Sequence, residues 1–124
     1  MPQPRVVLLV DDDTICLAIA ESMVKSFGFS TLIARDGFEA LAVFQAHKEA
    51  IACVVLDIEM PRMDGIATFQ QLKQIREDIC VIIASGYLGE ANMAKLVPLH
   101  PAGYLRKPLA YQTFTSMLEK CINR

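Results

Sequence analysis

Residues 51–65 read IACVVLDIEMPRMDG, and this stretch decides the fold. Its first six residues form an uninterrupted apolar run, which is typical of a parallel strand buried on both faces. The run ends at Asp57, and the Asp64-Gly65 pair that follows is typical of a turn leading into a helix. We therefore predict a buried strand that delivers the carboxylate of Asp57 at its C-terminal end.

Polar side chains follow three other apolar runs of the chain in the same manner. Parallel strands bring their C-terminal ends to one edge of a sheet, where open α/β folds build their binding sites. We therefore expect these polar side chains to meet Asp57 at one edge. The runs and their polar residues are 6–10 with Asp11 and Asp12, 79–84 with Ser85, and 103–105 with Lys107.

Segments with a helical spacing of apolar residues alternate with these strands. In the first helix, Asp13 or Thr14 is a candidate N-cap and Gly28 is a natural stop. Its apolar positions with helical spacing are Ile15, Ile19, Met23 and Phe27. Further helices are expected from about residue 36, after residue 65, over 90–97 and over 111–122, and a short strand is expected over 31–34.

This alternation predicts five βα units in a single domain over residues 1–124. The expected fold class is α/β: a flavodoxin-like (βα)5 doubly wound parallel sheet with the strand order 2-1-3-4-5. Apolar and polar residues alternate less cleanly in the short strand at 31–34 than in the other strands. We therefore expect this strand at an edge of the sheet. Pro98 and Pro101 predict that the helix over 90–97 is short or irregular.

Composition restricts the class of protein. The chain has 124 residues, 53% of them hydrophobic, and a formal net charge of −2. No apolar run approaches the ~20 residues needed to span a bilayer, and the N-terminus lacks the apolar stretch of a signal peptide. Basic residues are scattered, which argues against nucleic-acid binding by this chain. We therefore expect a cytoplasmic protein without membrane contact.

Four cysteines invite a disulfide or zinc interpretation: Cys16, Cys53, Cys80 and Cys121. Their spacings match no zinc motif, and each lies in an apolar context. We expect buried, reduced thiols that act as small hydrophobic side chains.

Three carboxylates are expected to crowd the sheet edge. Asp11, Asp12 and Asp57 would repel one another there, and a hard divalent cation is the usual relief. Mg²⁺ suits such a site because it takes one or two carboxylates, keeps its waters and leaves positions for a phosphate. A carboxylate beside Mg²⁺ can attack phosphorus and form an aspartyl phosphate. Ser85 and Lys107 would then offer a hydroxyl and a positive charge to the phosphoryl oxygens.

Over essentially its whole length the chain resembles the receiver domain of two-component response regulators. The resemblance rests on a set of motifs in a fixed order along a fivefold βα pattern. They are Val-Asp-Asp at 10–12, Asp57 with Met60-Pro61 and Met63-Asp64-Gly65, Ser85-Gly86, and Tyr104 with Lys107-Pro108. Together these motifs are highly specific.

The resemblance implies that Asp57 is a phosphoacceptor. Its donor would be a histidine kinase, a histidine phosphotransfer domain or a small molecule such as acetyl phosphate. Asp11, Asp12 and Asp57 would hold Mg²⁺ together with the backbone carbonyl of Glu59. Lys107 would pair with the phosphoryl group, and the Lys107-Pro108 peptide is expected to be cis, as in the family.

The family further implies switch and tuning residues. Ser85 would swing toward the phosphoryl group and Tyr104 would rotate inward behind it, which would change the face formed by the last two helices and the strand between them. Gly86 would leave room for access of the phosphodonor. Glu59 and Tyr87 occupy the positions that tune the hydrolysis of the aspartyl phosphate in the family.

Two other interpretations remain open. The stretch VDDDT at 10–14 also resembles the first motif of haloacid-dehalogenase-type phosphatases, with Asp11 as nucleophile and Asp13 as acid. That interpretation leaves Asp57 without a role, and the chain is short for the later motifs. The other is a receiver fold that docks partners without being phosphorylated. Under the favoured interpretation the chain is not an enzyme, and it promotes only its own phosphotransfer and dephosphorylation.

The sequence leaves the wider context open. The chain is expected to be a stand-alone regulator or the receiver of a larger regulator or hybrid histidine kinase, with a downstream output domain or protein as partner. Partner surfaces of the family often involve the first helix and the loop before the last. Candidates there are Ile15, Ile19, Leu109 and Tyr111, although Ile15 and Ile19 are expected to belong to the core.

Overall fold

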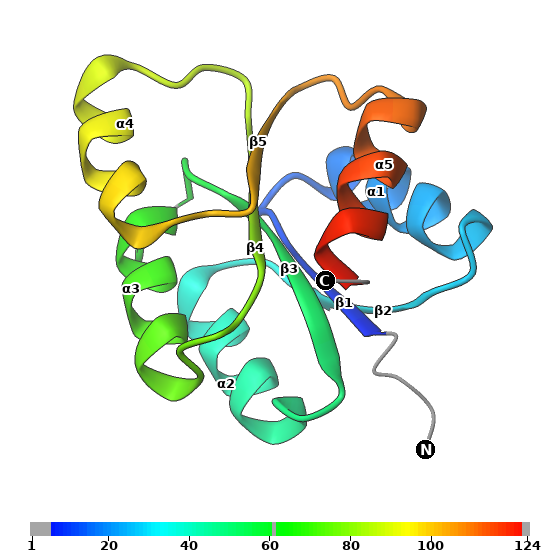
Figure 1. Ribbon diagram of the computed structural model, residues 1–124, viewed down its shortest axis with the longest axis horizontal. Helices are drawn as coiled ribbons and strands as arrows, with labels where there is room; N and C mark the ends of the chain where they lie inside the picture. Colours follow the sequence, from blue (N-terminus) through cyan, green and yellow to red (C-terminus); the bar gives the residue numbers. More distant parts are fainter. Residues whose placement is uncertain (1–5, 61, 123–124) are drawn as a thin grey trace.

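The computed structural model of the chain describes residues 6–60 and 62–122. Five parallel strands form one sheet in the order β2-β1-β3-β4-β5, which confirms the predicted order (Figure 1). The strands are β1 (Val6–Val10), β2 (Ser30–Ala34), β3 (Ile51–Asp57), β4 (Val81–Ser85) and β5 (Gly103–Arg106). The helices are α1 (Thr14–Ser26), α2 (Gly37–His47), α3 (Gly65–Ile75), α4 (Glu90–Leu96) and α5 (Tyr111–Ile122), with a 3-10 helix, η1 (Val97–Leu99), after α4.

Helices cover both faces of the sheet. Helices α1 and α5 lie on one face, and α2, α3 and α4 lie on the other (Figure 1). Successive residues of a strand point to opposite faces. In β1, Leu8 and Val10 therefore join the core beneath α2, α3 and α4, while Val7 and Leu9 join the core beneath α1 and α5. This two-sided burial explains why the central strands read as continuous apolar runs.

Aspartates begin the three helices that start near the acidic edge of the sheet. The side chain of Asp13 caps α1 by accepting hydrogen bonds from the backbone N–H groups of Ile15 at 2.8 Å and Cys16 at 3.1 Å. Asp36 caps α2 and Asp64 caps α3 in the same way. The first N–H groups of a helix have no partner within it, and carboxylate oxygens accept their hydrogen bonds. These three aspartates therefore determine the residue at which each helix begins.

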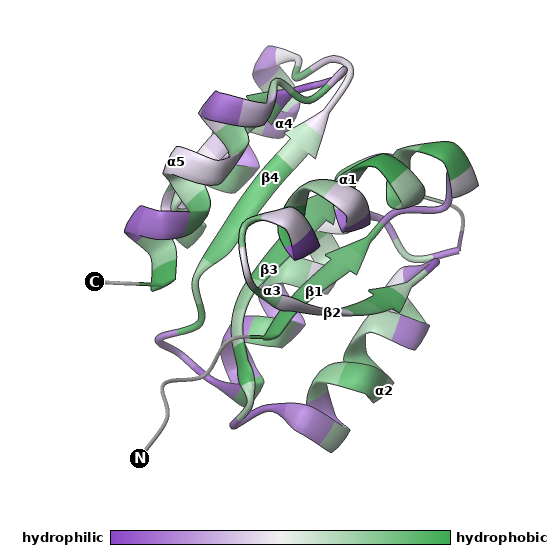
Figure 2. Cartoon of the chain, turned by 90° about the vertical axis from the view of Figure 1, so that its right-hand side faces the viewer, coloured by the Kyte–Doolittle hydropathy of each residue, from purple (hydrophilic) through white to green (hydrophobic). Residues whose placement is uncertain are grey.

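The inward face of α1 differs from the expectation. Ile15 is 71% exposed and Ile19 is 46% exposed, so neither belongs to the core. Leu17, Ala20 and Val24 are buried instead. Both sets of residues have helical spacing, because α1 is apolar along much of its length; the first half of this helix is green in Figure 2. A helix that is apolar on several sides does not reveal from its pattern alone which side packs on the sheet.

The other boundaries follow the expected pattern with small changes. Strand β4 begins at Val81, two residues later than predicted. Helix α4 is short, as the two prolines predict, and Pro98 lies within η1. The Lys107-Pro108 peptide is cis, as expected. In the part of the chain that the structure describes, no helix has the length and apolar character to cross a membrane.

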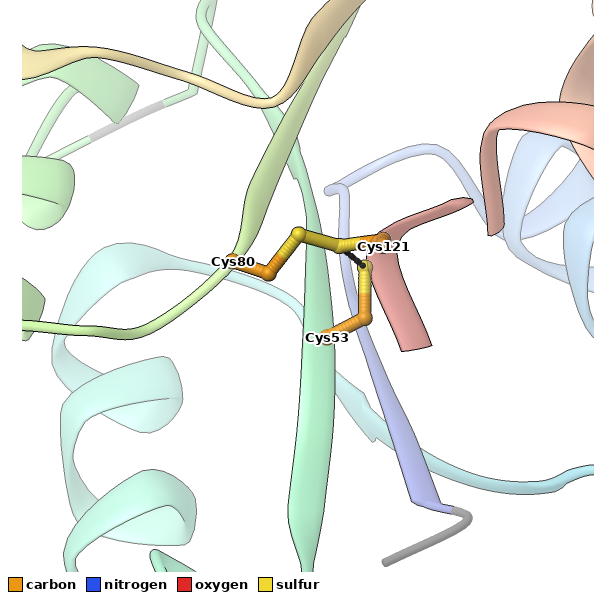
Figure 3. Close-up of side chains that lie close together, drawn as sticks. All are labelled: Cys53, Cys80 and Cys121. Atoms are coloured by element: carbon orange, nitrogen blue, oxygen red, sulfur yellow. Dashed lines mark hydrogen bonds between the residues drawn. A yellow bond between two sulfur atoms is a disulfide. The ribbon is translucent and has the colours of Figure 1, made fainter. Parts of the chain in front are cut away.

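The cysteine prediction was wrong in part. Cys53 is a buried thiol and Cys16 is half-buried, but Cys80 and Cys121 are paired as a disulfide with a Cα–Cα distance of 6.0 Å (Figure 3). Cys80 immediately precedes β4, and Cys121 lies in the last turn of α5. The fold brings these two segments together. The positions of the two cysteines in the sequence do not reveal this contact.

Candidate functional site

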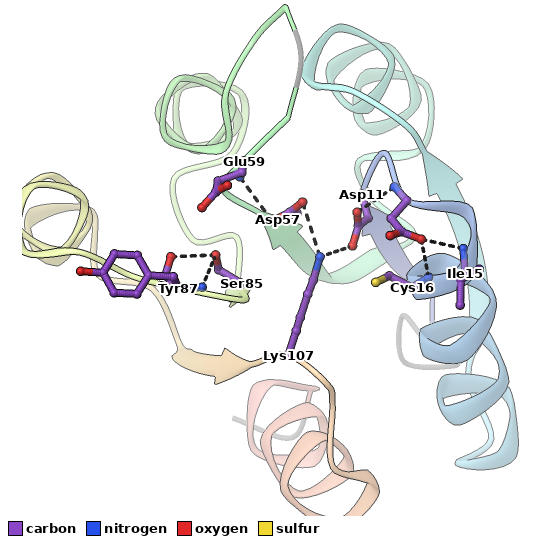
Figure 4. A network of polar contacts seen from close by, with 9 residues as sticks. Asp11, Ile15, Cys16, Asp57, Glu59, Ser85, Tyr87 and Lys107 are labelled. Atoms are coloured by element: carbon purple, nitrogen blue, oxygen red, sulfur yellow. Dashed lines mark hydrogen bonds and ion pairs between the residues drawn. The ribbon is translucent and has the colours of Figure 1, made fainter.

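An open pocket of about 360 Å³ lies where the strands end at their C-terminal side. It gathers side chains from four loops that are far apart in the sequence (Figure 4). Its lining consists of Asp11, Asp12, Asp13, Asp57, Glu59, Ser85, Gly86, Tyr87 and Lys107. Of the predicted site residues, Tyr104 is the one outside this lining, and it lines the neighbouring pocket with Ser85, Gly86 and Tyr87. Pro61 of the Met60-Pro61 motif lies outside the described residues.

Asp57 is the last residue of the central strand β3 and is only 6% exposed. One of its carboxylate oxygens accepts a hydrogen bond from the backbone N–H of Glu59 at 3.3 Å. The loop between β3 and α3 folds back against the end of β3, where the N–H of Gly65 donates a hydrogen bond to the carbonyl of Ile58 at 2.9 Å. A Cβ at position 65 would lie 2.6 Å from the Cα of Ile58, so only glycine permits this approach.

Asp11 and Asp12 follow β1. Asp11 is 7% exposed and accepts a hydrogen bond from the backbone N–H of Asp13 at 2.9 Å, whereas Asp12 is exposed. Carboxylate oxygens of Asp11, Asp12 and Asp57 all lie within 4.8 Å of one another. Oxygen ligands at this spacing are what a hard cation such as Mg²⁺ requires, so the donor set fits the predicted metal.

Lys107 bridges two of these carboxylates. Its Nζ lies 2.5 Å from an oxygen of Asp11 and 3.5 Å from an oxygen of Asp57. Its backbone N–H donates to the carbonyl of Ser85 at 2.9 Å, which fastens the loop after β5 to the end of β4. The ammonium therefore supplies the compensating charge that two nearly buried carboxylates need.

Burial and the neighbouring charges together shift the pKa values of Asp57 and Lys107. Burial raises the pKa of Asp57 to about 6; the ammonium of Lys107 opposes this rise and the charge of Asp11 adds to it. Burial on its own would lower the pKa of Lys107, but the hydrogen bond to Asp11 and the charge of Asp57 outweigh it and raise that pKa. Asp57 thus has a raised pKa in a pocket that faces solvent, which is typical of a functional carboxylate.

The hydroxyl of Ser85 forms its hydrogen bonds with the backbone of the loop that follows β4. Ser85 is 2% exposed, its Oγ donates to the carbonyl of Tyr87 at 3.0 Å, and the backbone N–H of Tyr87 donates to the same Oγ at 3.4 Å. The ring of Tyr87 is 69% exposed, while Tyr104 is half-buried and burial raises its pKa. A Cβ built on Gly86 would meet no described atom within 4 Å, so the mouth of the pocket is open on this side.

Sequence reasoning missed an apolar pocket that adjoins the acidic site. An apolar pocket of about 170 Å³ lies beside Asp11, Asp57 and Lys107, between α1 and the loop after β5. Ile19 and Leu109, named as candidates for partner contact, line it, and so does Cys16. The excess of apolar residues on α1 was the signal that could have found this pocket.

A family model described as "Response regulator receiver domain" matches residues 7–119. Among curated proteins, the chain is 29% identical over 116 residues to the transcriptional regulatory protein ZraR of Escherichia coli K12, with 94% of the chain and 26% of the relative covered. It is 33% identical over 106 residues to the response regulator protein TodT of Pseudomonas putida, with 83% of the chain and 44% of the relative covered. The chain thus spans less than half the length of these relatives.

Solved structures resemble the whole chain. A response regulator receiver domain protein from Clostridium thermocellum superposes with a TM-score of 0.90 at 27% identity, and the match covers 97% of this chain and 95% of that one. A chain of the CheX–CheY–BeF3–Mg²⁺ complex from Borrelia burgdorferi superposes with a TM-score of 0.88 at 28% identity, covering 95% of this chain and 89% of that one.

Proposed function

The chain belongs to the response regulator receiver domain family, and we propose that Asp57 is its phosphoacceptor. The observation that carries the proposal is the position of Asp57: a nearly buried carboxylate with a raised pKa, facing an open pocket beside two further carboxylates and one ammonium. On this proposal residues 1–124 form one receiver domain in the cytoplasm. A histidine kinase or histidine phosphotransfer domain supplies the phosphoryl group.

The transfer uses the ionised form of Asp57. A carboxylate oxygen attacks phosphorus, the new O–P bond forms, and the P–N bond of the phosphohistidine breaks so that the imidazole leaves with the electron pair and takes a proton. When bound, Mg²⁺ would supply positive charge to the phosphoryl oxygens. Asp11, Asp12, Asp57 and the backbone carbonyl of Glu59 would hold it.

On this proposal, Lys107 and Ser85 form new contacts once Asp57 carries the phosphoryl group. Phosphorylation removes the charge of the Asp57 carboxylate and brings phosphoryl oxygens into the pocket, so the ammonium of Lys107 pairs with them. The hydroxyl of Ser85 turns from the carbonyl of Tyr87 toward the same oxygens. A contact that exists only in the phosphorylated protein can shift a conformational equilibrium.

The switch then reaches the surface through Tyr104. This ring lines a pocket of about 380 Å³ together with Ser85 and Tyr87, so there is space near Ser85 into which the ring can rotate. Its movement changes the face formed by α4, β5 and α5, where an output domain or protein is recognised. Gly86 keeps the mouth open to the phosphodonor, and Glu59 and Tyr87 tune the hydrolysis of the aspartyl phosphate.

The likeness to longer regulators supports a partner of this kind. The relatives that match are named as transcriptional and response regulators, and the chain spans only part of them. The neighbour from the BeF3–Mg²⁺ complex supports the choice of metal. The chain acts on its own phosphoryl group rather than on a separate substrate.

One observation speaks against the phosphatase alternative. Asp13 would be the general acid there, but it caps α1, and the backbone N–H groups of Cys16 and Ile15 lower its pKa. A general acid needs a pKa near the working pH. A carboxylate that is held ionised by two N–H groups does not supply a proton readily.

The test is the intact mass of the protein after incubation with acetyl phosphate and Mg²⁺. We expect the gain of one phosphoryl group. The Asp57→Asn variant and a sample with EDTA serve as controls, and both should show no gain. If neither acetyl phosphate nor candidate kinases phosphorylate a folded protein that binds Mg²⁺, the domain is an unphosphorylated docking module.

A further inference from the structure

Three cysteines converge at the end of the sheet opposite the acidic pocket. Cys53 belongs to the first half of β3, Cys80 immediately precedes β4, and Cys121 lies in the last turn of α5. Cys80 and Cys121 form the disulfide, and the Sγ of Cys53 lies 3.2 Å from the Sγ of Cys121 (Figure 3). All three are at most 5% exposed. Cys121 is thus the shared neighbour of two other sulfur atoms.

A surface pocket gives access to the disulfide. Its volume is about 470 Å³, and both Cys80 and Cys121 line it, together with Met117 and Lys120. Cys53 is not part of its lining. Lys120 is the one charged residue among the described residues that line it. A cation favours both the thiolate form of a nearby cysteine and the approach of an anionic reagent.

We propose that Cys80 and Cys121 form a reversible redox site that exchanges with a small anionic disulfide and thiol of the glutathione class. The pocket admits the reagent, Lys120 attracts its carboxylates, and the two sulfur atoms meet on the pocket wall. The reagent does not reach Cys53 directly, because Cys53 does not line the pocket, and the proposal therefore assigns the exchange to Cys80 and Cys121. The site goes beyond the proposed phosphoryl chemistry and does not depend on it.

The reaction balances with glutathione disulfide as oxidant. One cysteine, as its thiolate, attacks a sulfur of glutathione disulfide; that S–S bond breaks, a mixed disulfide forms, and one glutathione thiolate leaves. The second cysteine loses its proton to solvent and attacks the protein sulfur of the mixed disulfide. The Cys80–Cys121 bond forms and the second glutathione thiolate leaves, so two electrons have passed from the protein to glutathione.

Oxidation fastens the end of α5 to the sheet. The bond joins residues separated by 41 positions, and the segment between them contains β4, α4, β5 and nearly all of α5. A cross-link of this span removes much of the freedom that the chain gains when it opens. The last turn of α5 therefore opens less often in the oxidised protein than in the reduced protein.

Non-reducing peptide mapping tests the assignment. The folded chain is equilibrated with glutathione disulfide or with glutathione, its free thiols are alkylated after unfolding, and the digest is analysed without reduction. We expect a cross-linked Cys80–Cys121 peptide after oxidation and its loss after reduction, with Cys16 and Cys53 alkylated in both. Four alkylated cysteines at every glutathione ratio would overturn the proposal, and so would a cross-link through Cys53.

Variants and hydrogen exchange test the consequence. Cys16→Ala, the matched control outside the cluster, and Cys53→Ala should both keep the cross-link, while Cys80→Ala should lose it. In the wild-type chain, amides at the end of α5 should exchange on the order of a hundredfold more slowly after oxidation. This comparison uses the wild-type chain in its two redox states, so it does not depend on whether any variant folds. Equal exchange in both redox states would refute the role in fastening α5.

Discussion

The central residue is a carboxylate that the fold makes unfavourable to ionise. Asp57 lies at the end of a buried strand, and its pKa of about 6 stands well above the reference value of 3.8. Lys107 compensates only part of this cost, since its Nζ is closer to Asp11 than to Asp57. The site therefore holds excess negative charge, which is the condition under which a cation binds well.

The raised pKa predicts how stability depends on pH without metal. The folded state holds the Asp57 proton more tightly than the unfolded chain, so the contribution of this group to the free energy of unfolding is full below pH 4 and is lost as the pH rises through about 6. The Asp57→Asn variant should therefore be more stable than the wild type at neutral pH, by roughly 1–3 kcal/mol at about 1.4 kcal/mol for each unit of pKa.

Urea unfolding at several pH values, in EDTA, measures this difference. The advantage of Asp57→Asn should disappear at acidic pH, where Asp57 is protonated in both states. Saturating Mg²⁺ should stabilise the wild type and reduce the gap at neutral pH. A variant that is less stable than the wild type at neutral pH without metal would contradict the charge balance described for this pocket.

At the scale of the elements, the loop between β3 and α3 sets the position of Asp57, the proposed phosphoacceptor. Gly65 lets the chain pass behind Asp57 at a distance that a side chain does not permit. We predict that Gly65→Ala lowers the free energy of unfolding by about 1–3 kcal/mol and weakens Mg²⁺ binding, because the loop must move away from the sheet. Calorimetric titration with Mg²⁺ and urea unfolding check both effects. Gly86→Ala, at an open position, is the matched control and should change stability little.

The packing of α1 offers a second test at this scale. Leu17 is buried beneath the helix, whereas Ile15 is 71% exposed. Leu17→Ala should cost about 2–4 kcal/mol in the free energy of unfolding, and Ile15→Ala should cost less than about 1 kcal/mol. Thermal or urea unfolding of the two variants gives the comparison. A larger cost for Ile15→Ala than for Leu17→Ala would mean that α1 packs with the face that the sequence pattern had suggested.

For the whole molecule, the sequence predicts topology better than it predicts contacts across the core. The parallel sheet and its polar edge follow from four apolar runs and their polar ends, and the order 2-1-3-4-5 follows from the flavodoxin-like pattern of five βα units. The acidic cluster follows for the same reason. The outward position of Ile15 and Ile19 does not follow, since α1 is apolar on more than one side. The pairing of Cys80 with Cys121 depends on how α5 crosses the sheet, which no local pattern records.

The most direct test of the central claim locates the phosphoryl group within the chain. The protein is phosphorylated with acetyl phosphate and Mg²⁺, the acyl phosphate is reduced with borohydride, and the digest is mapped by mass spectrometry. Borohydride converts an aspartyl phosphate to homoserine, which marks the residue that carried the phosphoryl group. We predict homoserine at position 57 and none at positions 11, 12 or 13. Homoserine at position 11 would contradict the account and favour the phosphatase interpretation.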